Sequence, residues 1–212
     1  MARGALIIFE GVDRSGKSTQ IKRIFNQMVN KGENVHLTRF PERTSEIGQT
    51  INGYLKSSND LSDQAIHLLF SANRWEHAQS ILNYMNNGTS VLVDRYAFSG
   101  VAFTAAKGLD LEWCKNPDRG LPKPDLVLQL DVDEETAKKR GGFGEERYEK
   151  VEFQRQVRKL YSQLREEHSD IWKIIDASAS VDELTPALQN HVDETIKSCQ
   201  NKDIEKLWIK RD

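Results

Sequence analysis

Residues 11–18 read Gly-Val-Asp-Arg-Ser-Gly-Lys-Ser, the residue types and spacing of a loop that binds the phosphates of a nucleoside triphosphate. The glycines let backbone N–H groups turn toward phosphate oxygens, and the helix that follows adds the positive end of its dipole. Lys17 would reach the β- and γ-phosphates, and Ser18 would hold Mg²⁺. The alternative is a glycine-rich turn that binds nothing, but the strand-like run before the loop and the helical pattern after it favour the phosphate site.

A carboxylate is expected at the end of a neighbouring strand, where it would lie beside the magnesium ion. The apolar run 91–93 ends in Asp94, and we assign this role to Asp94, acting through water. An aspartate at a strand end is also a common turn former. Asp94 therefore carries weight only together with the phosphate loop.

The phosphate loop does not separate a kinase from a GTPase switch, an ATPase motor or a binding module. A GTPase reads guanine with an Asn-Lys-x-Asp loop that follows a strand. The nearest strings, Asn-Lys-Gly-Glu at 30–33 and Asn-Lys-Asp-Ile at 201–204, differ from that loop in residues and in placement. The sequence therefore argues against a GTPase.

Three arginines could form a second anion site, which a kinase needs when its acceptor already carries a phosphate. Arg43 follows one predicted strand, Arg95 follows another, and Arg74 lies in a helical segment. The carboxyl ends of parallel strands open on the crevice where α/β sheets bind ligands. Each arginine alone is more often a solvated surface residue or part of a structural ion pair, but three at such positions in a near-neutral protein favour an anion site.

The elements that must position these residues alternate between short apolar runs and helix-length amphipathic segments. Runs such as 6–9 and 91–93 are apolar without strict alternation, as in a parallel sheet covered by helices on both faces. The sequence predicts the α/β class: one domain over residues 1–212, with a five-stranded parallel sheet flanked by helices in three layers. The predicted strands are Ala5–Glu10, Val35–Phe40, Ser90–Asp94, Asp125–Asp131 and Trp172–Asp176.

Helical segments fill the intervals between the predicted strands. Gly32 and Gly88 stand where the C-terminal ends of two helices are expected. Residues 116–124 hold three of the five prolines and predict an ordered loop into the fourth strand rather than a domain boundary. The predicted helices are Lys17–Lys31, Leu61–Met85, Glu145–Glu167 and Val181–Cys199.

Composition and charge exclude several classes of protein. Charged residues make up 29% of the chain and no apolar stretch approaches transmembrane length, so a membrane protein is not expected. The formal net charge of -2 gives no general attraction to nucleic acid, so any affinity for phosphate is local. Cys114 and Cys199 lack partners at metal-ligand spacing and indicate neither a zinc site nor a disulfide framework. The first apolar run is too short for a signal peptide, which predicts a cytosolic chain, with the nucleus as an alternative.

Three further motifs resemble those of the thymidylate kinases, specifically the eukaryotic and poxvirus type. They are Phe-Pro-Glu-Arg at 40–43, Leu-Leu-Phe-Ser-Ala-Asn-Arg-Trp at 68–75 and Asp-Arg-Tyr-Ala-Phe-Ser-Gly-Val-Ala-Phe at 94–103. The similarity continues at 120–127 and 146–149 and covers nearly the whole chain. It implies the fold of a P-loop nucleoside monophosphate kinase and transfer of the γ-phosphoryl group of ATP to dTMP, giving dTDP and ADP in dTTP synthesis.

The resemblance assigns roles to residues around dTMP. Phe70 would stack on the thymine ring and Arg74 would donate to a base carbonyl, and their spacing of four places both on one face of a helix. Without the resemblance, Phe70 could equally be a core residue with Arg74 passing beside it. Asp13 would accept a hydrogen bond from the sugar 3′-hydroxyl, and Tyr148 would crowd C2′ and disfavour ribonucleotides. The predicted dTMP site is Asp13, Phe40, Arg43, Phe70, Arg74, Arg95, Ser99, Gly100, Phe103 and Tyr148, with Arg43 and Arg95 on the acceptor phosphate.

The resemblance also implies a donor site and a set of catalysts. The attacking oxygen belongs to an ionised phosphate, so alignment and charge neutralisation replace general-base chemistry. Arg14 resembles the catalytic arginine of the type that carries this residue in the phosphate loop. The predicted catalytic residues are Arg14, Lys17, Asp94 and Arg95, and Ser18 and Asp94 would serve Mg²⁺. The predicted ATP site is Arg14, Ser15, Gly16, Lys17, Ser18, Thr19, Arg95, Arg140 and Ala179.

Residues 134–148 predict a lid over ATP, because the basic run Lys-Lys-Arg at 138–140 precedes the glycine-rich run 141–144. Closure of such a lid would exclude water. The alternative is a solvated helix end with cations near its C-terminus. Adenine is expected between the lid and residues 176–180. Close relatives place a lysine where this chain has Ala179, which puts a side-chain contact to adenine and the donor selectivity in doubt.

The resemblance implies a homodimer packed through helices, and Leu61–Met85 is a candidate because it is long and apolar on more than one side. Two rival functions stay open. One is a monophosphate kinase with a different acceptor, and the other is a nucleotide-binding module without catalysis, against which Arg14, Lys17, Asp94 and Arg95 argue.

Overall fold

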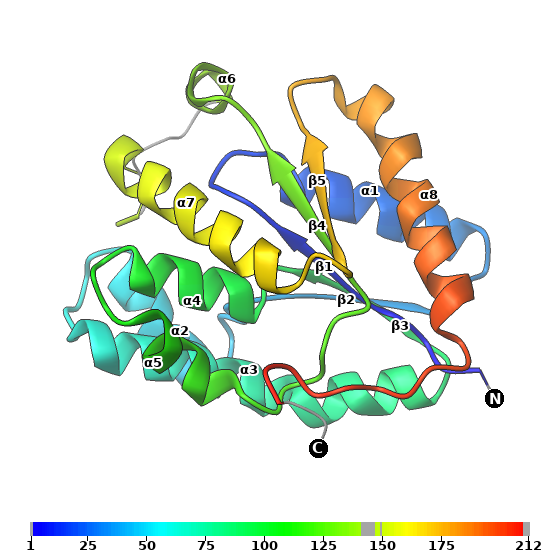
Figure 1. Cartoon of the computed structure of the whole chain (residues 1–212), viewed down its shortest axis with the longest axis horizontal. Helices are drawn as coiled ribbons and strands as arrows, with labels where there is room; N and C mark the ends of the chain where they lie inside the picture. The colour runs from blue at the N-terminus through cyan, green and yellow to red at the C-terminus, as the bar shows by residue number, and fades with distance from the viewer. Residues whose placement is uncertain (1, 141–146, 149, 210–212) are drawn as a thin grey trace.

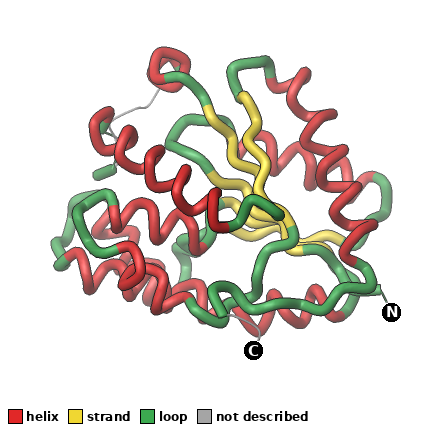
Figure 2. Tube along the Cα trace, viewed as in Figure 1, coloured by secondary structure: helices red, strands yellow, loops and turns green. Residues whose placement is uncertain are grey.

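The computed structural model describes residues 2–140, 147–148 and 150–209. Five strands form one parallel sheet in the order β2-β3-β1-β4-β5. Figure 2 shows the strands gathered at the centre of the molecule with helices around them. The prediction of five parallel strands is confirmed, with ends shifted by at most one residue: β1 Leu6–Glu10, β2 Val35–Arg39, β3 Ser90–Asp94, β4 Leu126–Asp131 and β5 Trp172–Asp176.

Helices cover both faces of the sheet and give three layers (Figure 1). On β1, Leu6 and Ile8 pack toward α3, α4 and α7, whereas Ile7 and Phe9 pack toward α1 and α8. Because successive side chains of a strand point to opposite faces, a fully apolar strand is what two covered faces require. The helices are α1 Lys17–Asn30, α2 Glu46–Leu55, α3 Asp63–Asn86, α4 Ala97–Ala105, α5 Leu111–Lys115, α6 Glu134–Lys139, α7 Val151–Glu167 and α8 Val181–Cys199.

Helix ends follow local capping residues. The Ser62 hydroxyl accepts the Ala65 N–H, so α3 begins at Asp63, two residues later than predicted. Gly32 and Gly88 have φ of 74° and 76° just beyond α1 and α3, which confirms both as helix-ending glycines. The proline-rich segment contains a short 3-10 helix at Asn116–Asp118 before it reaches β4.

The predicted helix Glu145–Glu167 is wrong at its start. Its first two residues lie outside the described part, Arg147 and Tyr148 form a turn, and α7 begins at Val151. The N–H of Arg147 donates to the Leu55 carbonyl at the end of α2, which pulls this segment away from the helix axis. Tertiary contacts have therefore overridden the helical pattern.

Four helices, α2, α4, α5 and α6, are absent from the prediction. Most of α4 is buried, and no polar face marks it as helical. α5 and α6 have five and six residues, too few for a clear period. No helix in the described residues is long and apolar enough to cross a membrane.

Candidate active site

The phosphate loop joins β1 to α1 in a conformation that its glycines permit. Gly11 has φ of 134°, and a Cβ there would lie 2.2 Å from the Leu130 carbonyl oxygen, so a larger residue is excluded. Gly16, with φ of 93°, is the N-cap of α1 and supplies no side-chain cap. The first N–H groups of α1 are thereby left for an anion.

A cavity of about 850 Å³ opens beside this loop. It extends from the start of α1 to α6 and the loop before α8, the region where the sequence predicts ATP. Every residue predicted to contact ATP lines the cavity: Arg14, Ser15, Gly16, Lys17, Ser18, Thr19, Arg95, Arg140 and Ala179. Their roles stay predictions, because position alone does not establish contact with a nucleotide.

Lys17, Ser18 and Asp94 all line this cavity. The Lys17 ammonium donates to the Val12 carbonyl over 2.7 Å, and Ser18 Oγ donates to Asp94 Oδ2 over 2.6 Å. Burial, reinforced by the charge of Arg95, lowers the pKa of Lys17 to about 8. Asp94, Asp13 and Glu10 act in the opposite direction, and a phosphate beside Lys17 would add further negative charge and favour the protonated amine.

Arg140 closes one side of the donor cavity. Its guanidinium donates to the Arg14 carbonyl over 3.2 Å and to the Ala177 carbonyl over 2.5 Å. It thus links α6 to the phosphate loop and to the loop before α8. The predicted glycine-rich part of the lid, 141–144, lies outside the described residues.

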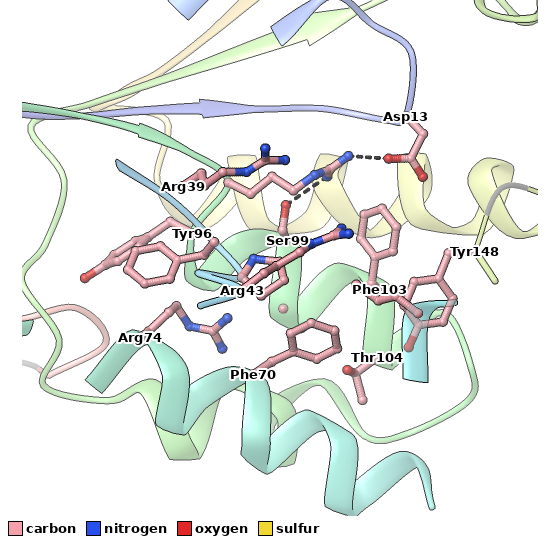
Figure 3. A pocket seen from close by; sticks show the side chains of 15 residues that line it. Asp13, Arg39, Arg43, Phe70, Arg74, Tyr96, Ser99, Phe103, Thr104 and Tyr148 are labelled. Carbon is pink, nitrogen blue, oxygen red and sulfur yellow. Dashed lines mark hydrogen bonds and ion pairs between the residues drawn. The ribbon is translucent and has the colours of Figure 1, made fainter. Parts of the chain in front are cut away.

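A second cavity, of about 100 Å³, lies between α3, α4 and the end of β2 (Figure 3). Figure 3 shows Phe70 and Arg74 reaching it from α3, with Arg39 and Arg43 on the opposite side. Every residue predicted to contact dTMP lines it: Asp13, Phe40, Arg43, Phe70, Arg74, Arg95, Ser99, Gly100, Phe103 and Tyr148.

The two cavities share part of their lining. The shared residues come from the phosphate loop, from the last residue of β2 and from the segments that follow β2 and β3, where the carboxyl ends of neighbouring strands meet. Three of the five are arginines, which places positive charge where the cavities adjoin. These shared residues are Asp13, Arg39, Phe40, Arg43 and Arg95.

Arg95 is fixed at this junction by several contacts. It forms an ion pair with Asp13, and it donates to the Gly11 carbonyl over 3.1 Å and to Ser99 Oγ over 3.2 Å. Its guanidinium also lies 5.1 Å from the centre of the Phe103 ring. Burial acts to lower the pKa of Arg95, but the charge of Asp13 and other acidic neighbours outweighs it, so the pKa lies above its ordinary value.

Arg74 is held by a carboxylate that the sequence patterns did not reveal. Its Nε and one terminal nitrogen donate to Asp118 over 3.1 and 2.6 Å, and both side chains are almost fully buried. A Cβ on Gly100 would lie 2.7 Å from the same guanidinium. Asp118 and Gly100 therefore set the position of Arg74 in the wall of the smaller cavity.

Arg39 was also missed, although a signal for it existed. It is the last residue of β2 and lies opposite Asp94 in the sheet register, so the strand-end reasoning applied to Asp94 includes it. Asp118 gives no such signal, because it lies in the proline-rich segment, 44 residues from Arg74. Only the packing of that segment against α3 brings the two together.

Comparison with known proteins gives the family. The thymidylate kinase family model matches residues 9–187. The chain is 48% identical over 206 residues to a thymidylate kinase of Dictyostelium discoideum, covering 97% of this chain and 92% of the relative. It is 46% identical to the thymidylate kinase of Homo sapiens, covering 97% of this chain and 98% of that one.

A solved structure of a thymidylate kinase from Candida albicans matches the fold with a TM-score of 0.87 at 40% identity. The match covers 97% of this chain and 99% of the other. The Candida protein is described as having broad substrate specificity and a novel structural element. With the family model, the relatives and the fold in agreement, this chain belongs to the thymidylate kinase family.

Proposed function

We propose that this protein transfers the γ-phosphoryl group of ATP to dTMP, giving dTDP and ADP in the synthesis of dTTP. The observation that carries the proposal is the junction of the two cavities at three arginines and the phosphate loop. A donor triphosphate in the larger cavity and an acceptor phosphate in the smaller one would meet there. Membership of the thymidylate kinase family supports dTMP as the acceptor.

In the proposed reaction, the protein aligns two phosphates and neutralises their charge. Lys17 and the N–H groups at the start of α1 bind the donor phosphates, while Arg43 and Arg95 hold the acceptor phosphate. The attacking oxygen is already ionised, so no general base is needed. Arg14, from the loop itself, stabilises the charge that develops on the transferring group.

In the smaller cavity, thymine lies against Phe70 and receives a hydrogen bond from Arg74. Asp13 accepts from the sugar 3′-hydroxyl, and Tyr148 crowds a 2′-hydroxyl. Tyr148 is well placed for this role because its ring stacks on Phe153 and packs against Phe103, which limits its movement.

Mg²⁺ is proposed as the cofactor. The hydroxyl of Ser18 and the carboxylate of Asp94 are hard oxygen donors 2.6 Å apart on the donor cavity, which fits an ion that keeps waters and binds substrate phosphates. The described residues contain no cluster of three or more acidic, histidine or cysteine side chains that could hold a metal alone. When bound, Mg²⁺ would neutralise charge on the β- and γ-phosphates.

A homodimer in the cytosol, with the nucleus as an alternative compartment, completes the proposal. Leu68 and Trp75, seven residues apart on α3, are 48% and 43% exposed and share one face of the helix. That apolar face supports association through α3. Cys114 and Cys199 are buried free thiols, as is usual in reducing compartments. A fluorescent fusion imaged in cells checks the compartment.

The test of function is a coupled assay of ADP release with ATP, Mg²⁺ and a panel of dTMP, dUMP, dGMP and thymidine. We expect turnover to be fastest with dTMP and absent with thymidine, which carries no phosphate for the arginines. Faster turnover with another monophosphate would identify a different acceptor. No ADP release with any of them would favour a nucleotide-binding module without catalysis.

A further inference from the structure

Glu10 is a fully buried carboxylate at the centre of the molecule that takes no part in the mechanism above. It is the last residue of β1 and immediately precedes Gly11, where the phosphate loop begins. Burying a carboxylate is costly unless hydrogen bonds compensate it. The donors around Glu10 therefore indicate what the residue does.

One oxygen of Glu10 caps α4, although Glu10 lies far from that helix in the sequence. Oε1 accepts the N–H of Tyr96 over 3.0 Å and that of Ser99 over 3.1 Å, the N-cap and third residues of α4. Tyr96 supplies no side-chain cap of its own. Glu10 thus replaces the usual capping residue and places negative charge at the positive end of the α4 dipole.

The other oxygen joins two side chains. Oε2 accepts from the Ser99 hydroxyl and, over 2.9 Å, from the Tyr161 hydroxyl on α7. Ser99 Oγ in turn accepts from the Arg95 guanidinium. Burial raises the pKa of Glu10, whereas the bond from Ser99 and the charge of Arg95 act against that rise. A continuous chain of contacts runs from Glu10 through Ser99 to Arg95.

The backbone at Arg95 needs such support. Arg95 has φ of 68°, a left-handed conformation that is uncommon for a residue with a side chain and persists when its surroundings fix it. Glu10 accepts from the N–H groups of Tyr96 and Ser99, which follow Arg95 in the chain. The Arg95 N–H itself donates to the Phe9 carbonyl on β1. β1 therefore fixes both sides of this strained residue.

We infer that Glu10 is a positioning residue that holds Arg95 and the N-terminus of α4 in register with the phosphate loop. α4 contributes Ser99, Gly100 and Phe103 to the smaller cavity, and the donor loop starts one residue after Glu10. One carboxylate thereby couples the acceptor site to the donor site. The inference rests on the proposed function, because it assigns the smaller cavity to the acceptor.

The experiment compares Glu10→Gln with Tyr161→Phe and with the control Glu166→Gln, a change at an exposed position on α7. Glu10→Gln keeps the shape of the side chain, but its NH₂ group must face donors. The measurements are kcat, the KM values for dTMP and ATP, dTMP binding by calorimetry and the melting temperature. All four proteins are measured at the same concentration of folded enzyme.

For Glu10→Gln we expect kcat/KM for dTMP to fall about 10- to 100-fold, as for loss of hydrogen bonds to a charged group. The KM for ATP should change less than about twofold, because the loop keeps its own contacts. Tyr161→Phe removes one of four donors and should lower kcat/KM for dTMP by about threefold or more. Glu166→Gln should match the unmodified protein in every parameter.

A purely structural role predicts a lower melting temperature with unchanged kinetics per folded molecule, and that result would overturn the inference. An equal rise in the KM values for ATP and for dTMP would also overturn it. If Glu10→Gln does not fold, Tyr161→Phe decides by the same selective loss for dTMP. Absence of ADP release by the unmodified protein would reject the proposed function instead, so the two claims fail by different results.

Discussion

Arg14 shows how one residue in the phosphate loop can act on the reaction rather than on binding. It adopts φ of 63° and lines the donor cavity, while its carbonyl accepts from Arg140. The backbone of Arg14 thus helps to hold the loop. In the proposed reaction, its guanidinium stabilises the charge that develops on the transferring phosphoryl group. A substitution at Arg14 removes the guanidinium but keeps the carbonyl that accepts from Arg140, so the two roles can be tested separately.

We predict that Arg14→Ala lowers kcat by about 10²- to 10³-fold, the loss seen when one donor to a developing charge is removed. The dissociation constant for ATP should change less than about threefold, because the backbone N–H groups of the loop remain. Steady-state kinetics and calorimetric titration with ATP measure the two effects. Equal losses in both would contradict a role confined to the transition state.

A second prediction at this scale concerns Gly100. A Cβ there would lie 2.7 and 2.9 Å from two nitrogens of Arg74, and the ion pair with Asp118 makes movement of that guanidinium costly. Gly100→Ala should displace Arg74 at a cost of about 1–3 kcal/mol and raise the KM for dTMP by roughly tenfold. Kinetics with dTMP, at saturating ATP, check the effect. An unchanged KM would mean that Arg74 does not contact the acceptor.

Among the elements, α4 depends on a residue distant in the chain for its N-cap. It begins at Ala97, shortly after Asp94 at the end of β3 and Arg95 beyond it, and its N-cap contact comes from Glu10 on β1. It is buried on nearly all sides, so its sequence shows no amphipathic period. This helix, which carries much of the smaller cavity, is therefore one of the four that the sequence pattern did not predict.

The segment after α8 is held by a histidine that must stay neutral. Trp208 Nε1 donates to His168 Nε2 over 2.9 Å, and Leu207 exchanges backbone hydrogen bonds with the loop at Gly120 and Leu121. Figure 1 shows this segment crossing the molecule toward the C-terminus. Burial lowers the pKa of His168, consistent with its role as an acceptor.

A lowered pKa in the folded state makes stability fall in acid. Below a pH of about 6.5 the unfolded chain takes up a proton at His168 that the folded chain does not, so unfolding becomes more favourable. We predict that the melting temperature falls between pH 7 and pH 5 and that His168→Gln, which keeps an acceptor, makes this fall smaller. Scanning calorimetry across this range checks it, and an identical fall in both proteins would contradict it. His36 and His67, whose pKa values are also lowered, contribute to the fall that remains.

At the scale of the whole molecule, the strand order concentrates charge that the composition hides. The net charge is only -2, yet β2, β3 and β1 lie side by side and bring their carboxyl ends together. Arg39, Arg43 and Arg95 consequently gather around the phosphate loop. The positive charge available to a phosphate therefore lies at this edge of the sheet and not over the surface as a whole.

The proposed dimer gives a prediction for the surface. Leu68→Glu puts a charge on the exposed apolar face of α3 and should shift the protein from dimer to monomer, since an unpaired charge in an apolar interface is costly. Val29→Glu, an equally exposed site on α1, is the matched control and should remain dimeric. Sedimentation velocity measures both. A monomeric unmodified protein would remove the dimer from the proposal.

The sequence by itself determined what depends on neighbouring residues. Apolar runs predicted the strands most directly for β1, β3 and β4, which are buried on both faces and therefore require an unbroken apolar segment, whereas the edge strands β2 and β5 are partly exposed. The spacing of Gly11, Gly16 and Lys17 predicted the phosphate loop, because that geometry lies within eight consecutive residues. Family motifs added the remaining residues proposed to contact ATP and dTMP.

Only the tertiary structure decided which distant residues meet. The pairing of Arg74 with Asp118, the capping of α4 by Glu10 and the turn at Tyr148 each join segments far apart in the chain. Such contacts depend on strand order and on how the connecting segments cross the sheet, and no local pattern of apolar and polar residues encodes either. The same physics explains why the strands were predictable and the residues that hold the two cavities in register were not.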